Sequence, residues 1–281
     1  MPNSRVLVVV SYYNARQDDR LDMLLSQLRD VPAGMDFHTA VVVNRAVDED
    51  LAIAAKYPDI EVCYRENRGY NIGAWNHGWR LFPSWDLYVF LQDECLIAQR
   101  HWLRHLCASA QAGGGRLVGE CLVDAAQTWA EADSSYQEFY ASQGIEPSRW
   151  DPASGDLHTA SFIQHYLEQQ GIPTQPTMRH LRSLVLCVPG HVLSDMGGFP
   201  IGQSYREAVG AEVGCSQRAQ ALGYQIRQAG LLPYTYVIHP QWMAERCQAR
   251  SFKGILNQVV KRFVPISTRL SLRRARRQAR P

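Results

Sequence analysis

The sequence lacks the features that mark membrane-spanning and exported chains. No apolar run in its 281 residues approaches the ~18 residues that a transmembrane helix needs. The first stretch, MPNSRVLVVVSYYN, has neither a long apolar h-region nor a small-residue cleavage site. We therefore expect a cytoplasmic protein of ordinary globular composition, and we interpret the apolar start as a strand.

Metal-binding cysteine pairs and glycine-rich phosphate loops are also missing. The seven cysteines are odd in number, scattered and without a CxxC, which argues against a zinc ribbon and a disulfide framework. We expect most of them to be reduced core residues. No GxGxxG follows the first apolar run and no GxxxxGK[ST] occurs, which disfavours a Rossmann dinucleotide site and a P-loop. Any bound phosphate must then be held by a metal ion or by basic side chains.

Acidic residues are absent from residues 251–281, which contain nine Lys or Arg. Removing these nine from the 29 basic residues of the chain leaves 20 against 27 acids, a charge of −7 for residues 1–250. A mildly acidic body therefore carries a strongly basic tail. Such a segment commonly meets an anionic surface, either a membrane or a nucleic acid.

An alternation of strand and helix patterns fills roughly the first 95 residues. Apolar runs predict strands at 5–13, 37–44, 60–67 and 87–92, and helical spacing predicts helices at 18–31, 49–58 and 71–82. Further on we expect helix and strand at 101–123, a part-helical insertion at 127–182, a strand and turn at 183–200, a helix at 205–223, and strands at 224–230 and 234–242. Strands separated by helices predict an α/β fold with a mainly parallel sheet.

Polar residues follow each of the first four predicted strands, in SYYN, NRAVDED, RENRGYN and QDEC. Because open parallel sheets bind ligands beyond the carboxyl ends of their strands, these four stretches are expected to meet at one mouth. The last of them places Asp93 and Glu94 beside Gln92. The pair predicts either a metal site for a phosphate-bearing substrate or a solvated strand end.

Seven stretches in this order resemble a GT-A fold glycosyltransferase of the family 2 type. They are VVVSYYNAR, AVVVN, ENRGYNIGAWNHG, LYVFLQDEC, PGHVLSDMGGFP, GAEVGCSQRAQALGYQI and VIHP. The resemblance spans roughly Val6 to Pro240, and it depends on the ordered set because no single motif is decisive. It implies a GT-A (Rossmann-like) domain at 1–250, with a nucleotide-binding half at 1–100 and an acceptor-side half at 101–250, followed by the tail.

The resemblance implies a set of donor-binding residues in the first half. Tyr12, Tyr13 and Asn14 would line the nucleotide base. Asn44, followed by Arg45, stands where the family usually has an aspartate, and this departure leaves the base open. The glycine- and asparagine-containing stretch would border the ribose and phosphates through Asn67, Gly69, Gly73, Asn76 and Gly78. The competing interpretation of that stretch is a strand-to-helix turn followed by an amphipathic tryptophan helix.

The resemblance also implies a divalent metal, Mn²⁺ or Mg²⁺, at the end of the fourth strand. Such ions take hard oxygen ligands, typically one or two carboxylates with phosphates and water. The usual aspartate-rich motif is Gln92-Asp93-Glu94 here, so Asp93 and Glu94 would carry the metal while Gln92 contacts the metal or the donor. His239 would complete the metal shell, although a histidine at a strand end is also a common structural residue.

For catalysis the resemblance points to Glu212, at the position of a base that deprotonates the acceptor hydroxyl. Glu207 is the rival base, and an acid near a helix N-terminus is also favoured by the helix dipole alone. Arg218 is expected to pair with the donor diphosphate or with another carboxylate.

Together these expectations describe an inverting, metal-dependent, hexosyltransferase-type enzyme that moves a sugar from a nucleotide-sugar donor to an acceptor hydroxyl. The acceptor would belong to a bacterial surface glycan or a lipid-linked glycan. One alternative is a catalytically weakened or metal-independent GT-A protein that binds a nucleotide or sugar, which the departures at Asn44 and Gln92 favour. A second is a nucleotidyltransferase, for which SYYNARQDD is a poor first loop.

The tail combines apolar residues at helical spacing with its basic cluster. The apolar positions are Phe252, Ile255, Leu256, Val259, Val260 and Phe263. This pattern predicts an interfacial helix on the anionic inner face of a membrane. The alternative is a helix docked on the core, followed by a solubilising tail. Nucleic acid is not expected, since no reader motif accompanies the charge.

Deleting residues 251–281 is predicted to abolish sedimentation of the protein with anionic liposomes. Each Lys or Arg near such a surface contributes about 1 kcal/mol, so the nine of the tail dominate the attraction. Liposomes without anionic lipid are the control, and they should sediment neither form. Sedimentation that survives the deletion would refute the membrane role.

Overall fold

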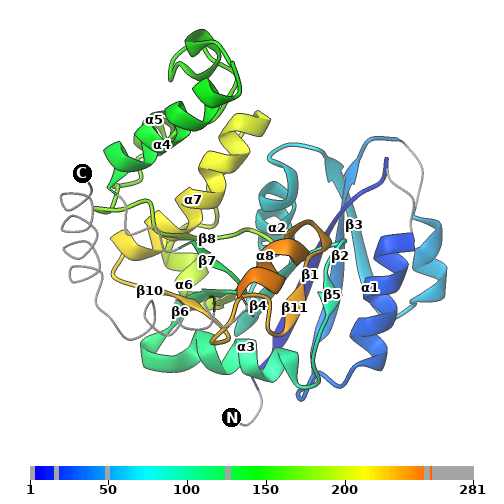
Figure 1. The fold of residues 1–281 in the computed structure, drawn as a ribbon. Helices are drawn as coiled ribbons and strands as arrows, with labels where there is room; N and C mark the ends of the chain where they lie inside the picture. Colours follow the sequence, from blue (N-terminus) through cyan, green and yellow to red (C-terminus); the bar gives the residue numbers. More distant parts are fainter. Residues whose placement is uncertain (1–3, 16–18, 48–50, 124–127, 250–253, 255–281) are drawn as a thin grey trace.

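A seven-stranded sheet forms the centre of the computed structural model, which describes residues 4–15, 19–47, 51–123, 128–249 and 254 (Figure 1). The strand order is β10-β6-β9-β4-β1-β2-β3, and every neighbouring pair is parallel except those that involve β9. The predicted α/β fold with a mainly parallel sheet is therefore confirmed. The tail, apart from Gly254, lies outside the described residues, and none of the described helices is long and apolar enough to cross a bilayer.

The strands of the central sheet are β1 (Val6–Tyr13), β2 (His38–Arg45), β3 (Ile60–Glu66), β4 (Leu87–Gln92), β6 (Arg116–Gly119), β9 (Val185–Pro189) and β10 (Gln225–Gln228). Two small antiparallel pairs join β5 (Leu96–Ile97) to β11 (Val237–Ile238) and β7 (Leu122–Val123) to β8 (His180–Leu181). The α-helices are α1 (Asp19–Asp30), α2 (Tyr70–Leu81), α3 (Trp102–Gln111), α4 (Trp129–Ser142), α5 (Ala160–Gln169), α6 (Gly190–Asp195), α7 (Tyr205–Ala221) and α8 (Met243–Ala249). Short 3₁₀ turns lie at Ala52–Lys56, Ala112–Gly114, Pro147–Trp150 and Pro240–Trp242.

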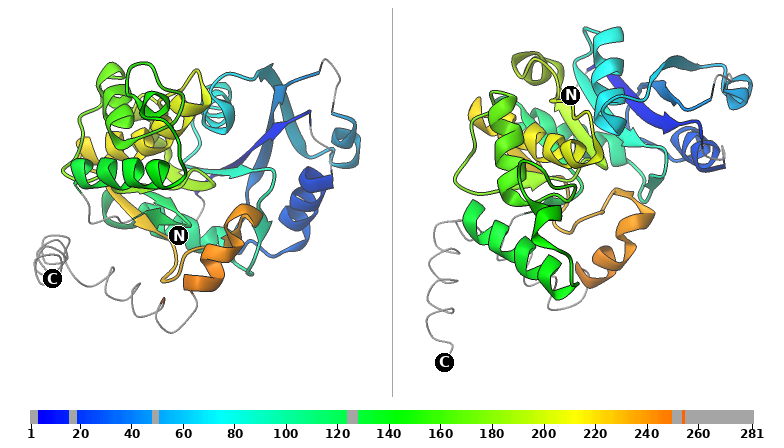
Figure 2. Two further views of the ribbon diagram at one scale, coloured as in Figure 1. Left: turned by 45° about the horizontal axis from the view of Figure 1, so that its top comes forward. Right: turned by 90° about the horizontal axis from the view of Figure 1, so that it is seen from above.

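Helices cover both faces of the sheet, and β1 shows how the sequence produces this. Leu7 and Val9 belong to the core that α2 and α4 to α7 close, whereas Val6, Val8 and Val10 belong to the core under α1 and α3. Successive strand side chains point to opposite faces, so an unbroken apolar strand must be buried on both. Figure 2 shows α1 and α2 on opposite sides of the strands.

The chain turns sharply from β3 into α2. Gly69, at the N-cap, and Tyr70, the first helical residue, both have positive φ, at 72° and 53°. A positive φ is costly for a tyrosine and is retained only where the surroundings enforce it. Further along α2, a Cβ on Gly78 would lie 2.7 Å from Val9 Cγ1. The glycine therefore lets the helix lie directly on β1.

Three segments differ from the expected pattern. The helix expected at 49–58 is only the short 3₁₀ turn Ala52–Lys56. Residues 190–195, expected as a turn, form helix α6, because Pro189 sets up its first turn and Gly197 and Gly198, both with positive φ, end it. The strand expected at 234–242 is only β11, which pairs with β5 outside the main sheet. The seven cysteines are all free, and five of them are buried, consistent with the expected core role.

A buried carboxylate holds the chain segment that precedes β11. Glu120, just after β6, is 1% exposed, and its carboxylate accepts backbone N–H groups of Thr235, Tyr236 and Val237 at 2.8–3.1 Å. Burial raises the pKa of Glu120 to about 7, although these hydrogen bonds lower it. Since the unfolded chain releases this proton near pH 4.5, the contribution to the free energy of unfolding is full below that pH and is lost as the pH rises through 7.

Glu120→Gln is predicted to lower the free energy of unfolding by about 1–3 kcal/mol at pH 5, because the new amide N–H group would face a backbone N–H donor. It should also flatten the dependence of stability on pH between 4.5 and 7. Urea unfolding at a series of pH values measures both effects. Glu168→Gln, at an exposed position on α5, is the matched control and should keep the slope of the unchanged protein. An unchanged slope in Glu120→Gln would contradict the prediction.

Candidate functional site

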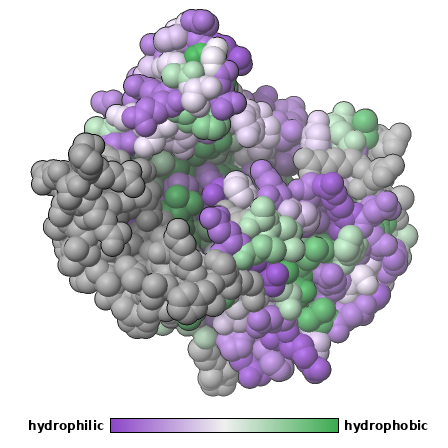
Figure 3. Space-filling view, in the orientation of Figure 1, coloured by the Kyte–Doolittle hydropathy of each residue, from purple (hydrophilic) through white to green (hydrophobic). Residues whose placement is uncertain are grey.

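A cavity of about 810 Å³ opens at the carboxyl edge of the parallel strands. One wall carries polar groups from the ends of all four N-terminal strands, including Tyr12, Tyr13, Asn44, Asn67 and Asp93. Figure 3 shows this face of the molecule hollowed below the lobe that α4 and α5 form. The predicted meeting of four strand ends is thus present as one cavity wall.

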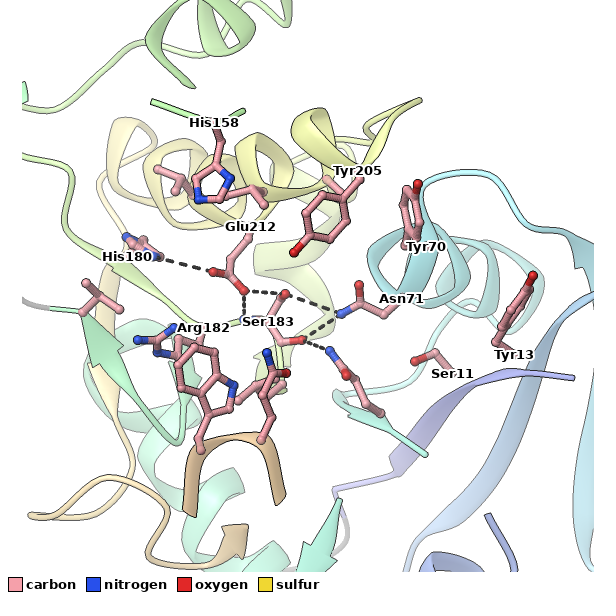
Figure 4. Close-up of a pocket in the computed structure, with 18 of the residues that line it drawn as sticks. Ser11, Tyr13, Tyr70, Asn71, His158, His180, Arg182, Ser183, Tyr205 and Glu212 are labelled. Carbon is pink, nitrogen blue, oxygen red and sulfur yellow. Dashed lines mark hydrogen bonds and ion pairs between the residues drawn. The ribbon is translucent and has the colours of Figure 1, made fainter. Parts of the chain in front are cut away.

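The facing wall comes from α7 and from the segment that leads into β9. Glu212 lies on α7, with its side chain 21% exposed, and points across the cavity toward Ser183 (Figure 4). Because β9 runs antiparallel to β4, with Val185 opposite Leu91, the residues just before β9 lie beside the end of β4. The antiparallel direction of β9 therefore brings Ser183, which is distant in sequence from β4, to the cavity.

Ser183 is the point where the two walls meet. Its backbone N–H and its hydroxyl both donate to Glu212 Oε2, each at 2.7 Å. Its carbonyl accepts from Asn71 Nδ2 and from Gln92 Nε2, each at 2.8 Å. Four hydrogen bonds therefore connect α2, β4 and α7 through one residue, and Figure 4 shows these side chains converging.

A second hydrogen-bonded group supports the strained turn at Tyr70. Asn44 is 3% exposed; its Nδ2 donates to the Tyr70 carbonyl at 3.1 Å, and its Oδ1 accepts from Arg65 at 2.7 Å. Arg65 also donates to the carbonyl of Arg68. Asn44 thus lines the cavity while both ends of its amide are bound to the turn.

Aromatic rings stand at the cavity mouth. Tyr70 from α2 and Tyr205 from α7 meet edge to face, with ring centroids 6.4 Å apart, and they are 37% and 68% exposed. On the opposite side the guanidinium of Arg182 lies 3.7 Å from the ring centroid of Trp242. The exposed rings of Tyr70 and Tyr205 suit a ligand that has flat or apolar faces.

Six predicted donor-binding residues do not line the cavity: Asn14, Gly69, Gly73, Asn76, Gly78 and Arg218. Asn14 binds backbone atoms of residues 46 and 47, and Asn76, which is 3% exposed, accepts from the backbone N–H of Phe199. Gly69 serves as the turn into α2. Arg218 donates to two backbone carbonyls, at 3.3 and 3.4 Å, away from the cavity. Their contacts hold the scaffold around the site.

The three predicted metal ligands have different surroundings. Asp93 lines the cavity and is 6% exposed. Glu94 pairs with Arg20 and lies with Oε2 3.2 Å from His239 Nε2. Among the described residues, no three His, Cys, Asp or Glu side chains converge as a metal-binding group. Asp93 therefore fits a metal as a single carboxylate ligand, and a cation there would take its other ligands from phosphate and water.

Both ring nitrogens of His239 are engaged within the protein. Its Nδ1 accepts the backbone N–H of Gln241 at 3.3 Å, so Nε2 carries the proton and faces Gln92 Oε1 at 3.3 Å and Glu94. A protonated nitrogen cannot ligate a metal. The ring is 1% exposed, and this geometry supports the structural interpretation of His239.

Several cavity residues were not expected from the sequence. They are Tyr136, His158, His180, Arg182, Ser183 and Tyr205, whereas Ser11, Tyr70 and Asn71 belong to the stretches SYYN and RENRGYN that were expected at the mouth. The one available signal was RS at residues 182 and 183, which directly precedes the apolar run of β9. These two residues can be placed at the cavity only when β9 is known to run antiparallel to β4. Glu207, the rival base, instead closes the first turn of α7 with Ser204 and does not line the cavity.

Comparisons by sequence identify no relative: no family model and no curated protein matches the chain. Comparison of structures gives matches to glycosyltransferases. A mannosyltransferase, PcManGT from Pyrobaculum calidifontis, in complex with GDP-Man and Mn²⁺, has a TM-score of 0.47 at 16% identity and matches 79% of this chain and 53% of its own.

Two further solved structures are similar at a lower level. S. aureus TarS 1–349, in complex with UDP-GlcNAc, has a TM-score of 0.42 at 16% identity over 76% of this chain and 54% of its own. GalNAc-T7 with UDP, GalNAc and Mn²⁺ has a TM-score of 0.35 at 15% identity over 41% and 22%. The chain spans about half the length of the PcManGT and TarS structures it matches. These similarities concern the GT-A-like fold alone.

His239→Ala is predicted to destabilise the protein by about 2–3 kcal/mol, because it leaves buried polar partners without their hydrogen bonds. The loss in free energy of unfolding should be the same in EDTA and in Mn²⁺, since the contacts of the ring are made within the protein. His165→Ala, at an exposed position on α5, is the control and should change stability by less than about 0.5 kcal/mol. A loss that appears only when Mn²⁺ is present would restore the ligand role.

Proposed function

We propose that this protein is a glycosyltransferase that moves a sugar from a nucleotide-sugar donor to an acceptor hydroxyl. The observation that carries the proposal is one cavity with two unlike walls. The polar ends of four parallel strands form the first wall, and the carboxylate of Glu212, held by Ser183, stands on the second. This arrangement suits a polar, phosphate-bearing donor on one side and an acceptor that needs a base on the other.

The donor lies along the strand ends in this proposal. Tyr13 offers a ring for the base, and Asn67 offers a polar group near ribose and phosphates. Tyr12, Asn44 and Gln92 belong to the same wall, where the amides of Asn44 and Gln92 are bound within the protein. The cavity volume of about 810 Å³ falls within the range of ligand sites, roughly 300–1,000 Å³. The rings of Tyr70 and Tyr205, at the junction of the two walls, are placed to contact the transferred sugar or the acceptor.

Glu212 is the catalytic base of the proposal. Its Oε2 is occupied by two donors from Ser183, which leaves Oε1 to accept the acceptor proton. Among the described residues that line the cavity, Asp93 and Glu212 are the carboxylates, and they belong to different walls. One base opposite the donor supports a single in-line displacement, and hence inversion at the sugar carbon.

A divalent cation, Mn²⁺ or Mg²⁺, is proposed at Asp93. When bound, it would neutralise the charge that develops on the departing nucleoside diphosphate. Because Asp93 is the one predicted ligand that lines the cavity, binding of the cation is expected to depend on the diphosphate being present. Asp93 itself would orient the donor through that contact.

The acceptor is proposed to be a glycan or lipid-linked glycan, used at the inner face of a membrane. Support comes from the basic tail of the sequence and from the aliphatic side chains on the acceptor side, which include Ile163, Met178, Val209 and Val213. Apolar walls of this kind favour an acceptor that carries more than a bare sugar.

A binding protein of the same fold, without turnover, is the second candidate. It is favoured by one observation: Gln92 occupies the position of a metal-binding aspartate, and both ends of its amide are bound, by Ser183 and His239. Such a protein would bind a nucleotide or sugar and transfer nothing.

Glu212→Gln is predicted to reduce turnover by about 10²–10⁴-fold while donor binding is retained, because the amide cannot accept the acceptor proton. The donor is found by a thermal-shift screen of UDP-, dTDP- and GDP-sugars with and without Mn²⁺ or Mg²⁺. Turnover is then followed by release of nucleoside diphosphate, and NMR of the product gives the anomeric configuration.

Glu207→Gln is the control for this experiment, since Glu207 lies on the same helix but outside the cavity. It should leave turnover within about twofold of the unchanged protein. If no nucleotide raises the melting temperature under any metal condition, donor binding is refuted. If a donor binds but neither protein turns over, the second candidate replaces the first.

A further inference from the structure

The inference concerns the free oxygen of Glu212 and depends on the proposed function of that residue. Oε2 of Glu212 accepts two hydrogen bonds from Ser183, whereas Oε1 lies 3.7 Å from His180 Nε2 (Figure 4). His180 lies on β8 and lines the same cavity, and its side chain is 8% exposed. The oxygen that must take a proton therefore faces a buried imidazole.

The hydrogen bond on the other side of the ring determines the tautomer of His180. Its Nδ1 is 2.8 Å from the carbonyl of Met178, and a carbonyl only accepts, so Nδ1 carries the hydrogen. Burial lowers the pKa of His180, although Glu212 and the Met178 carbonyl oppose this effect. The ring is then neutral at neutral pH, with a lone pair on Nε2.

The pair as it stands consists of two acceptors that face each other without a proton between them. A carboxylate oxygen and an imidazole lone pair at 3.7 Å make no hydrogen bond. A carboxylic acid at the same place would donate to Nε2 after a small approach, and catalytic hydrogen bonds commonly tighten in this way when substrate is bound. The arrangement of Glu212 Oε1 and His180 Nε2 therefore suits Glu212 in its protonated form, after it has taken a proton.

We propose that His180 is a positioning residue that receives, by hydrogen bond or transfer, the proton that Glu212 Oε1 takes from the acceptor hydroxyl. The O–H bond of the acceptor breaks and its proton goes to Oε1. The acceptor oxygen keeps the electron pair and forms the new bond to the sugar carbon, while the nucleoside diphosphate leaves with its own pair. Ser183 holds Oε2, so that Oε1 alone is used.

Other charged and titratable groups lie around Glu212 and His180. They affect the proton transfer between these two residues without taking part in it. Arg182, two residues along the chain, lowers the pKa of His180. His158, just before α5, and Tyr136, on α4, also line the cavity and feel the charge of Glu212. Burial lowers the pKa of His158 and raises that of Tyr136, so both are neutral near pH 7.

The first test is a pH profile of turnover in His180→Asn, whose amide can still donate to Met178. A proton on His180 Nε2 removes the group that receives the proton of Glu212, and the variant lacks this imidazole. We expect a plateau kcat lowered by about 10–100-fold, an acid limb moved to lower pH, and an unchanged Kd for the donor. A plateau within twofold, or a lowered plateau with the acid limb in its original place, would overturn the proposal.

The second test needs no turnover. Long-range ¹H–¹⁵N NMR of histidine-labelled protein reports the tautomer and the titration of each ring, and the His180 signal is identified by its loss in His180→Asn, or in His180→Gln if the first variant does not fold. We expect the Nδ1–H tautomer, and a lower titration midpoint in Glu212→Gln, where the favourable charge is gone.

His165, exposed on α5, is the internal control for the NMR experiment, and its signals should be the same in both proteins. An Nε2–H tautomer, or an unmoved His180 midpoint, would overturn the proposal even if the protein proves to be an active glycosyltransferase. Conversely, the expected NMR result in a protein that shows no turnover would support the arrangement of Glu212 and His180. It would then refute only the proposed glycosyltransferase activity.

Discussion

The two walls of the cavity depend on the hydrogen bonds of one residue, Ser183. Its carbonyl binds Asn71 and Gln92 on the strand-end wall, and its N–H and hydroxyl bind Glu212 on the other wall. Each such bond contributes about 0.5–1.5 kcal/mol net, so the four together make a substantial local constraint. The position of Glu212 relative to the strand-end wall is therefore fixed by backbone geometry at the start of β9.

The site combines groups already bound within the protein with groups that face the cavity. Asn44, Gln92 and His239 satisfy their polar atoms inside the protein, and they support the turn at Tyr70 and the end of β4. Tyr205 presents its ring to the cavity, and Glu212 presents Oε1. Preorganised support of this kind holds contacting groups in place, which is what a positioned reaction between two substrates requires.

The sequence predicted the N-terminal half well because that half follows simple rules. Unbroken apolar strands, such as β1, and the leucine face of α1 have strong periodic signals, and parallel strands bring their polar ends to one edge. The second wall was predicted poorly, since several of its residues come from short strands and turns. Ser183 and His180 gain meaning only from the reversal of β9 and from pairing of β7 with β8. The side chains of Asn76 and Arg218 make tertiary contacts away from the cavity, which no local sequence pattern indicates.

The reversed strand β9 has a consequence for how the chain is made. It fills the place between β4 and β6, yet it follows β4 by roughly 90 residues in the sequence. At a synthesis rate of ~5–20 residues per second, β4 waits about 5–20 s with one edge unpaired. An open apolar edge is a template for wrong pairing during that interval. Because β9 is made late, the nascent chain depends on protection of the free edge of β4. When β9 pairs with β4, it covers this edge and completes the site at the same time.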